Sequence, residues 1–467
     1  MKFPSMHYGR SGRLVTWIAS LAIVVSLAIG YQVHLRADEG NRPLLPAANP
    51  SGVAATFSTT GSFDFDNPFF KSLGTNGRSC VTCHQPDEGW TVSAAGVQRR
   101  FKMTNGADPI FRAVDGANCP NNATQGDAKA YSLLLSKALI RIDRPLPPGA
   151  EFSIVAIDDP NSCSTPTDIS VYRRPLPSTN LKFLSTVMWD GRESPKGKAI
   201  SDDLLQQAAD ATTGHAQATN APDLATLQKI RGFETSIFTA QVFDRRAGIL
   251  FEDGAKGGPI PLSRQNFFLG INDPLGGNPS GAPFDPNIFN LFDAWAAPDR
   301  HDDGDSRDGR EAVVRGQELF NTLVIPIIGV AGLNGPNDPS QATIQGRCGT
   351  CHDSPNVGDH SLSAPLNIGL TDASRRTPDL PLFTLRNNVS GQRVQTSDPG
   401  RAMVTGKWAD VGKFKGPILR GLAARAPYFH NGSAATLLDV VNFYDDRFNL
   451  NLTNQQKADL VAFLRTL

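Results

Sequence analysis

Two copies of one short motif combine cysteine and histidine at a fixed spacing. They consist of Cys80, Cys83 and His84, and of Cys348, Cys351 and His352. The spacing C-x-x-C-H is typical of covalent attachment of haem c, in which the histidine becomes the proximal ligand of the iron. A redox dithiol and half of a zinc site are the alternatives, but zinc needs four ligands at matched spacings. Because each motif ends on its own histidine, the sequence predicts two covalently attached haems c.

The other two cysteines, Cys119 and Cys163, stand in loop-like sequence after the first motif. An even number of remaining cysteines in an oxidising compartment indicates a disulfide bond, so we expect Cys119 to pair with Cys163. Two unpaired thiols are the alternative, and the cellular compartment decides between them.

The N-terminus bears on the compartment. Residues 1–37 begin with Lys2, Arg10 and Arg13 and continue into an uncharged apolar run that ends near Val33. Such a run is either a signal peptide or a membrane anchor, and its length is close to the ~20 residues of a spanning helix. In both cases the remainder is exported. We therefore expect a periplasmic or secreted protein, or one held at the inner membrane by this segment alone.

Composition excludes one class of partner and bounds the architecture. The 467 residues include 45 basic and 45 acidic side chains, a balance that provides no field for binding nucleic acid. The 43 glycines and 34 prolines indicate long connections rather than dense regular structure. The length suits two or three domains, and two distant haem motifs predict one haem domain for each.

The elements that position the motifs are predicted to be mainly helical. Helical periodicity covers residues 127–141, 202–212, 222–232, 309–321 and 452–465, and short strands are predicted at 151–157 and 169–172. Thr453, followed by Gln456, is typical of a capping box at a helix N-terminus. We also expect a helix that ends in the first motif and one that leads to the second.

The predicted fold class is mainly α, with two cytochrome c-like haem domains, loop-rich insertions and a few short strands. A linker at residues 38–62 precedes an N-terminal haem domain with insertions at 63–300. A second, charged linker at 301–308 leads to a C-terminal haem domain at 309–467.

Two further runs carry a resemblance to a known family. They are residues 415–433, which contain the sequence APYFHNG, and residues 188–192, which read MWDGR. Together with the haem motifs they are similar to the bacterial di-haem cytochrome c peroxidase and MauG family over most of residues 64–467. The resemblance implies two haems that face a shared interface. It also implies that peroxide meets the N-terminal haem and that electrons pass through the C-terminal haem.

The resemblance assigns a role to the tryptophan of the MWDGR run. In the family this tryptophan lies between the haems and relays electrons, which implies that role for Trp189. On the residues alone, Trp189 is an ordinary core anchor, and Arg192 forms a structural ion pair with Asp190. Arg192 is also a candidate partner of a haem propionate, because a guanidinium binds a carboxylate through two parallel hydrogen bonds.

The distal ligand of the second haem is predicted to be Tyr444. The family places a methionine or, in MauG, a tyrosine fourteen residues after the histidine that corresponds to His430, and Tyr444 stands there. Leu437, Val440 and Val441 put it on the apolar face of a helix. An ordinary buried tyrosine is one alternative, and Met403 is the competing ligand. A methionine would raise the potential of the haem, whereas a phenolate would lower it.

The first haem is predicted to be open, because no histidine occurs between His84 and His215. Many family members have a distal histidine in this interval and also a glutamate base about twenty residues after the tryptophan. This chain has no acid at the second position, and His215 is the predicted substitute, because imidazole titrates near neutral pH. Gln217 is a second polar candidate, and a surface or helix-capping role for His215 is the alternative.

Calcium is not expected between the haems, where many family members bind it. Arg174 and Arg425 replace an asparagine and a threonine of the family pattern, and two arginines repel a divalent cation. A solvated position for Arg174 is the alternative interpretation.

Three functions are compatible with these residues. The first is a peroxidase that reduces hydrogen peroxide with electrons from a small cytochrome c or a cupredoxin. The second is an oxidase or oxygenase that acts on an organic or protein substrate, as MauG and the di-haem rubber oxygenases do. The third is a plain electron-transfer cytochrome, for which the chain is long. The peroxidase is the preferred interpretation, on family analogy.

Overall fold

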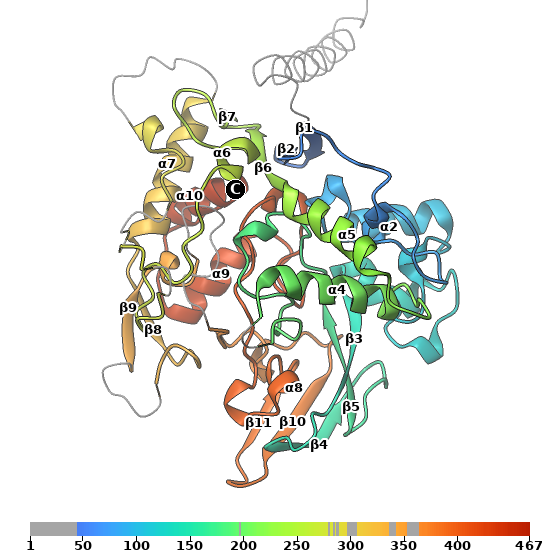
Figure 1. The fold of residues 1–467 in the computed structure, drawn as a ribbon. Coiled ribbons are helices and arrows are strands. Elements are labelled where there is room, and N and C mark those ends of the chain that lie inside the picture. Colours follow the sequence, from blue (N-terminus) through green and yellow to red (C-terminus); the bar gives the residue numbers. More distant parts are fainter. Residues whose placement is uncertain are drawn as a thin grey trace, which may run out of the picture.

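The computed structural model describes residues 44–195, 198–278, 281–283, 285, 289–296, 306–335, 342–352 and 364–467. The predicted signal peptide or anchor at 1–37 lies outside these ranges. Within them, no helix combines the length and the apolar character needed to cross a bilayer. Figure 1 shows the arrangement of the helices and strands.

Nine α-helices occur in the described residues. They are α2 (Ala94–Thr104), α3 (Ser132–Lys137), α4 (Ile200–Gly214), α5 (Leu224–Ser236), α6 (Pro259–Ser263), α7 (Arg307–Thr322), α8 (Ala402–Thr405), α9 (Leu437–Phe448) and α10 (Asn454–Arg465). Helices α4, α5, α7 and α10 confirm the predicted periodicities. The predicted capping box is also present, because the Thr453 hydroxyl accepts from the Gln456 amide at 3.2 Å and the Gln456 side chain accepts from the Thr453 amide at 2.9 Å.

Helices α7 and α10 form the core of the C-terminal half, to the left in Figure 1. They approach so closely at Gly316 that a Cβ atom there would lie 2.0 Å from the Asp459 carbonyl oxygen, so only glycine fits. Phe289, Phe320 and Phe463 pack between them. The Arg315 guanidinium binds the Asp459 carboxylate at 3.0 Å through two nitrogens at the same crossing.

Eleven strands occur in the described residues. They are β1 (Leu44–Asn49), β2 (Gly52–Ser58), β3 (Ile140–Pro145), β4 (Phe152–Asp158), β5 (Asp168–Arg173), β6 (Ile237–Asp244), β7 (Gly248–Ile249), β8 (Ile325–Ile328), β9 (Thr343–Gly346), β10 (Leu382–Asn387) and β11 (Arg393–Thr396). They form sheets in the orders β1-β2-β6-β7, β11-β10-β4, β3-β5 and β8-β9. The fold is therefore mixed, with 34% helix and 19% strand among the described residues, and the mainly α prediction needs this correction.

The predicted linker at 38–62 is largely a hairpin. Strands β1 and β2 occupy residues 44–58, and β2 pairs with β6 from Gly52 opposite Asp244 to Ser58 opposite Ile237. The partner strand is distant in sequence, and the pairing that stabilises the hairpin cannot be seen in the local pattern. For this reason the local sequence of residues 38–62 indicates a linker.

Two expected helices also differ from the structure. The segment before the first motif has only a short 3-10 turn at Pro68–Phe70. The chain is extended at Lys71 and forms no further helix before Cys80. The predicted helix over 127–141 consists of a 3-10 turn at Ala128–Tyr131 and α3, and it stops at Ala138, which has a φ of 53°. The chain then enters β3, whose hydrogen bonds to β5 override the helical propensity of these residues.

The two halves of the chain are joined by a shared sheet and by ion pairs. Strand β4 of the first half pairs antiparallel with β10 of the second, at the bottom of Figure 1. The Arg465 guanidinium binds Asp244 at 2.8 Å, and Lys137 binds Asp379 at 2.6 Å. The predicted disulfide between Cys119 and Cys163 is confirmed and fastens the loop before β5 to the loop after α2. These contacts set the relative position of the two motifs.

Candidate functional site

The two motifs adopt the same local structure. Each starts a 3-10 turn, Cys80–Thr82 in the first and Cys348–Thr350 in the second. The Thr82 hydroxyl accepts from the Ser79 amide at 3.0 Å, and the Thr350 hydroxyl accepts from the Arg347 amide at 2.9 Å. In both turns the histidine amide donates to the carbonyl of the first cysteine at 3.0 Å. The motif therefore places two thiols and one imidazole in one compact arrangement, twice.

Each turn forms part of the wall of its own cavity. Cys80, Cys83 and His84 line the first cavity, and Cys348, Cys351 and His352 line the second. The space between atoms is about 1390 Å³ in the first and about 1900 Å³ in the second, with their open mouths included. All four thiols are unpaired. Most of the lining side chains are apolar, as a macrocycle requires.

The imidazole of the first motif is prepared to bind a metal ion. The His84 Nδ1 lies 3.0 Å from the Trp90 carbonyl oxygen, so a proton on Nδ1 is held there and Nε2 is left for iron. Burial lowers the pKa of His84 to about 4, which keeps the ring neutral. Trp90 is in turn fixed by a hydrogen bond from its indole nitrogen to the Thr56 hydroxyl at 2.8 Å. Thr56 of β2 thus fixes Trp90, which in turn orients His84. This arrangement of the first motif fits a haem c.

At the second motif the structure brings His352 and Tyr444 together. The Tyr444 hydroxyl lies 3.4 Å from His352 Nε2, and both line the second cavity. Tyr444 is on α9 among Phe429, Phe443 and Phe448, and burial raises the pKa of its hydroxyl.

Met403, the competing ligand, is not brought to the second cavity. It is 1% exposed and packs with Phe152, Phe383 and Leu385 in the core between β4, β5 and β10. The structure therefore does not bring Met403 to the second motif.

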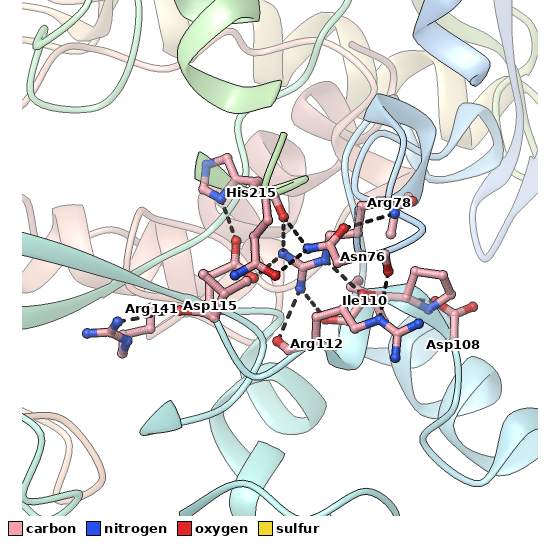
Figure 2. A network of polar contacts seen from close by, with 12 residues as sticks. Asn76, Arg78, Asp108, Ile110, Arg112, Asp115, Arg141 and His215 are labelled. Carbon is pink, nitrogen blue, oxygen red and sulfur yellow. Dashed lines mark hydrogen bonds and ion pairs between the residues drawn. The ribbon is translucent and has the colours of Figure 1, made fainter. Parts of the chain in front are cut away.

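A histidine in the wall of the first cavity is paired with a buried carboxylate. His215 ends α4 as its C-cap, lines the cavity and binds the Asp115 carboxylate through Nδ1 (Figure 2). The buried Arg78 guanidinium binds the other oxygen of Asp115 and the carbonyls of Pro109 and Ile110. Burial alone would raise the pKa of Asp115, but His215 and Arg78 hold it below its usual range. Asp115 is thus an ionised partner for the imidazole.

The other polar candidate does not join this pair. Gln217 is exposed and follows the C-terminus of α4 with a φ of 56°, and its side chain accepts from Asn76 at 3.3 Å. It is not among the residues that line the first cavity.

Sequence reasoning missed two acids near the first motif. Asp115 stands in a loop with no periodic signal. Glu234 lines the first cavity from α5, is buried, and has a carboxyl oxygen without a hydrogen-bond partner in the described part of the chain. Burial raises its pKa to about 8. The helical spacing from Ile230 and Leu227, which are also buried, is the signal that could have found Glu234.

Trp189 lies in the wall that the two cavities share. Arg174, Pro175, Trp189 and Lys415 line both cavities. The Trp189 indole donates to the Arg174 carbonyl at 2.8 Å, and its own carbonyl accepts from the Lys415 amide at 2.9 Å. The ring stands 6.0 Å from His430, centroid to centroid. An aromatic side chain is thus held rigidly between the two motifs.

Comparisons with known proteins find similarity to c-type cytochromes and to cytochrome c peroxidases. Residues 413–450, which include His430 and Tyr444, match a family model described as RoxA-like, cytochrome c-like. Cytochrome-c peroxidase IdrP1 of Pseudomonas sp. strain SCT is 31% identical over 198 residues, which are 38% of this chain and 45% of that protein. Cytochrome c551 peroxidase of Nitrosomonas europaea is 41% identical over 76 residues, 16% of this chain and 23% of that protein. Over the matched segments the chain is similar to cytochrome c peroxidases.

The chain aligns with less than half of the length of either of these peroxidases. Among solved structures, a MauG-like protein associated with microbial copper homeostasis is 16% identical to this chain. That comparison covers 90% of this chain and 93% of the other, with a TM-score of 0.38.

Arg192 lines the first cavity but already has acidic partners. It lies 3.2 Å from Asp190 and 3.6 Å from Glu193. Asp190 is fully buried and also binds Arg173, and although burial would raise its pKa, the arginines hold it low. The predicted propionate role of Arg192 stays a prediction.

Arg174 and Arg425 are both buried, which is contrary to the solvated alternative for Arg174. The Arg174 Nη1 donates to the Arg425 carbonyl at 2.7 Å, its Nη2 donates to the Val92 carbonyl, and the Arg425 Nη2 donates to the Ile418 carbonyl. The guanidinium groups thus bind carbonyl oxygens of the kind that calcium prefers. The expected absence of calcium stays a prediction.

Proposed function

We propose that the chain reduces hydrogen peroxide at the first cavity with electrons that enter through the second. The observation that carries the proposal is the asymmetry around a shared wall. Trp189 lines both cavities, whereas the His215 side chain, held by Asp115, lines only the first. The family's peroxidases support the same reaction class.

Two covalently bound haems would supply the one-electron chemistry, and reduction of one hydrogen peroxide to two water molecules consumes two electrons and two protons. Cleavage of the O–O bond needs a base that takes a proton from peroxide and returns it to the departing oxygen. His215 suits this task because ionised Asp115 keeps the proton on Nδ1 and stabilises the ring when Nε2 accepts another. Arg78 holds Asp115 in place.

Electrons would cross the wall at Trp189. Its hydrogen bond to Arg174 and its contact with His430 hold the ring in one orientation. The second motif would receive electrons from a small cytochrome c or a cupredoxin in the exported compartment.

One observation favours the alternative of an oxidase or oxygenase with an organic or protein substrate. Tyr444 faces His352, and a phenolate ligand would lower the potential of the second haem and favour its oxidised state. Such a haem stores a reducing electron poorly. The assay below therefore includes both reactions.

The proposal is tested by mixing the haem-loaded protein with reduced cytochrome c and hydrogen peroxide. His215→Gln should lower kcat/KM by roughly 10²–10⁴-fold, the usual contribution of a general base. Asp115→Asn should lower it less and move the pH profile, because the imidazole loses its ionised partner. Gln217→Ala, at an exposed residue that does not line the cavity, is the matched control and should leave the rate unchanged.

Undiminished turnover by His215→Gln would remove the histidine from the mechanism. Wild-type protein that accumulates an oxidised state with peroxide without consuming cytochrome c would decide for the oxidase or oxygenase alternative.

A further inference from the structure

Two buried arginines beside the second cavity have no acidic partner among the residues that the structure describes. Arg174 and Arg425 are 6% and 8% exposed, and both line this cavity. Their terminal nitrogens donate to backbone carbonyls, but the Nε atom of each has no hydrogen-bond partner in the described part of the chain. Two guanidinium charges are thus buried together without compensation.

Two other buried arginines of the same molecule, Arg78 and Arg173, are neutralised by acids. Arg173 binds Asp190 and Asp398, and Arg78 binds Asp115. Burying an unpaired charge costs several kcal/mol, so the contrast needs a physical reason. The different treatment of Arg174 and Arg425 indicates that their counter-charge comes from outside the polypeptide.

The neighbouring titratable groups do not supply that charge. The Tyr428 hydroxyl donates to the Leu422 carbonyl at 2.8 Å, and burial raises its pKa to about 12, so it is neutral. The Glu88 carboxylate is occupied by the Ser93 amide at 2.5 Å and by Arg99 at 3.1 Å. Burial lowers the pKa of Arg174 to about 9, with a further contribution from Arg425, and that of Arg425 to about 10. Both shifts show how poorly the charges are compensated by the protein alone.

We infer that Arg174 and Arg425 form an anion site for the propionate carboxylates of the bound haems. Arg174 lines both cavities and Arg425 lines only the second. Arg174 therefore contacts carboxylates on both sides of the wall, and Arg425 contacts those of the second haem alone. A guanidinium suits this task because its planar set of donors matches a carboxylate. The inference rests on haem attachment at the two motifs, but not on peroxide turnover.

The test is a spectroscopic redox titration of each haem in the loaded protein. Removing a buried positive charge disfavours the electron-rich reduced state, so both substitutions should lower midpoint potentials. Arg174→Gln should change the reduction equilibrium of both haems about tenfold, which is about 59 mV for one electron. Arg425→Gln should change that of the second haem alone. Arg307→Gln, at an arginine of α7 whose side chain is 62% exposed, is the control and should change neither.

Lysine variants keep the experiment decisive if a glutamine variant fails to fold. Arg174→Lys retains the charge and should shift the potentials less than Arg174→Gln. Unchanged potentials of both haems in Arg174→Gln would overturn the inference. A second haem whose potential is unchanged in Arg425→Gln, or a first haem whose potential shifts in Arg425→Gln, would also overturn it. The potentials of the haems can be measured even if the protein does not reduce hydrogen peroxide. A negative peroxidase assay would therefore not contradict the propionate site.

Discussion

The two cavities are built on the same cysteine and histidine turn but are surrounded by different chemistry. Among the described residues, the first cavity contains a carboxyl group, Glu234, and a histidine paired with a carboxylate, His215. The second contains no acid, and Tyr444 stands opposite its histidine. The first cavity thus has groups that can accept and donate protons. The second has a tyrosine hydroxyl 3.4 Å from Nε2 of its motif histidine. The same local motif thus has different surroundings in the two cavities, because the residues around each turn come from other parts of the chain.

The largest expected effect concerns the buried carboxyl of the first cavity. The pKa of Glu234 is raised from 4.5 to about 8, so the folded protein keeps a proton that the unfolded chain loses. The stability of the native state should fall as pH rises through this window, by about 1.4 kcal/mol per pH unit. Glutamine does not titrate, so the free energy of unfolding of Glu234→Gln should not fall in this way. Urea unfolding of the haem-loaded wild-type and variant proteins between pH 5 and 8 measures the difference.

Glu318→Gln is the matched control, because Glu318 is exposed on α7 and its substitution should leave the pH dependence as in wild type. If Glu234→Gln and wild type lose stability in parallel as pH rises, Glu234 is ionised in the folded protein. The contrast in proton chemistry between the cavities would then rest on His215 alone.

The next effect concerns closure of the second cavity. If Tyr444 is the distal ligand of the second haem, as we propose, cyanide should bind wild-type protein at the first haem only. Tyr444→Phe should open the second haem, so that its cyanide affinity rises at least about tenfold, or roughly 1.4 kcal/mol. Optical and EPR titration with cyanide measures both sites, and the spectrum of the first haem serves as the internal control.

A second haem whose spectrum does not change in Tyr444→Phe would eliminate Tyr444 as ligand. A resting first haem that is six-coordinate with two histidine ligands would contradict the prediction that the first haem is open.

The smallest effect tests what the cavities share. The hydroxyls of Thr82 and Thr350 make the same hydrogen bond in the two turns, at 3.0 and 2.9 Å. Thr82→Val and Thr350→Val should each lower the free energy of unfolding by about 1 kcal/mol, because each leaves one amide without its acceptor. The corresponding serine variants keep the hydroxyl and should recover most of the loss. A large difference between the two valine variants in urea unfolding would mean that the turns are not equivalent.

Much of the helical framework was predictable from local sequence. Helices α4, α5, α7 and α10 follow from periodicity, and the Thr453 capping box follows from two residue types at a fixed spacing. The sheets were less predictable, because β2 pairs with β6 and β4 with β10 across long stretches of chain. A strand that depends on a distant partner leaves only a weak trace in its own residues.

The candidate site divides in the same way. The motif cysteines and histidines, Trp189 and Tyr444 were identified from spacing and resemblance, and the structure places all of them on the two cavities. Met403 was an alternative ligand by residue type, but the structure buries it between β5 and β10, where it does not line the second cavity. Asp115 carries no sequence signal, because it meets His215 only when the loop after α2 folds back on the end of α4.

Local sequence was enough to predict haem c attachment at two motifs and the Cys119–Cys163 disulfide, because the reactivity of a thiol or an imidazole depends mainly on its residue type and spacing. The tertiary structure alone decided how the two motifs differ. Charge pairing, burial and the shared wall arise from side chains that are distant in sequence, such as Asp115 with His215 and Arg174 with Arg425. A pKa or a potential depends on everything within a few ångströms of a group, and only the folded chain brings those neighbours together.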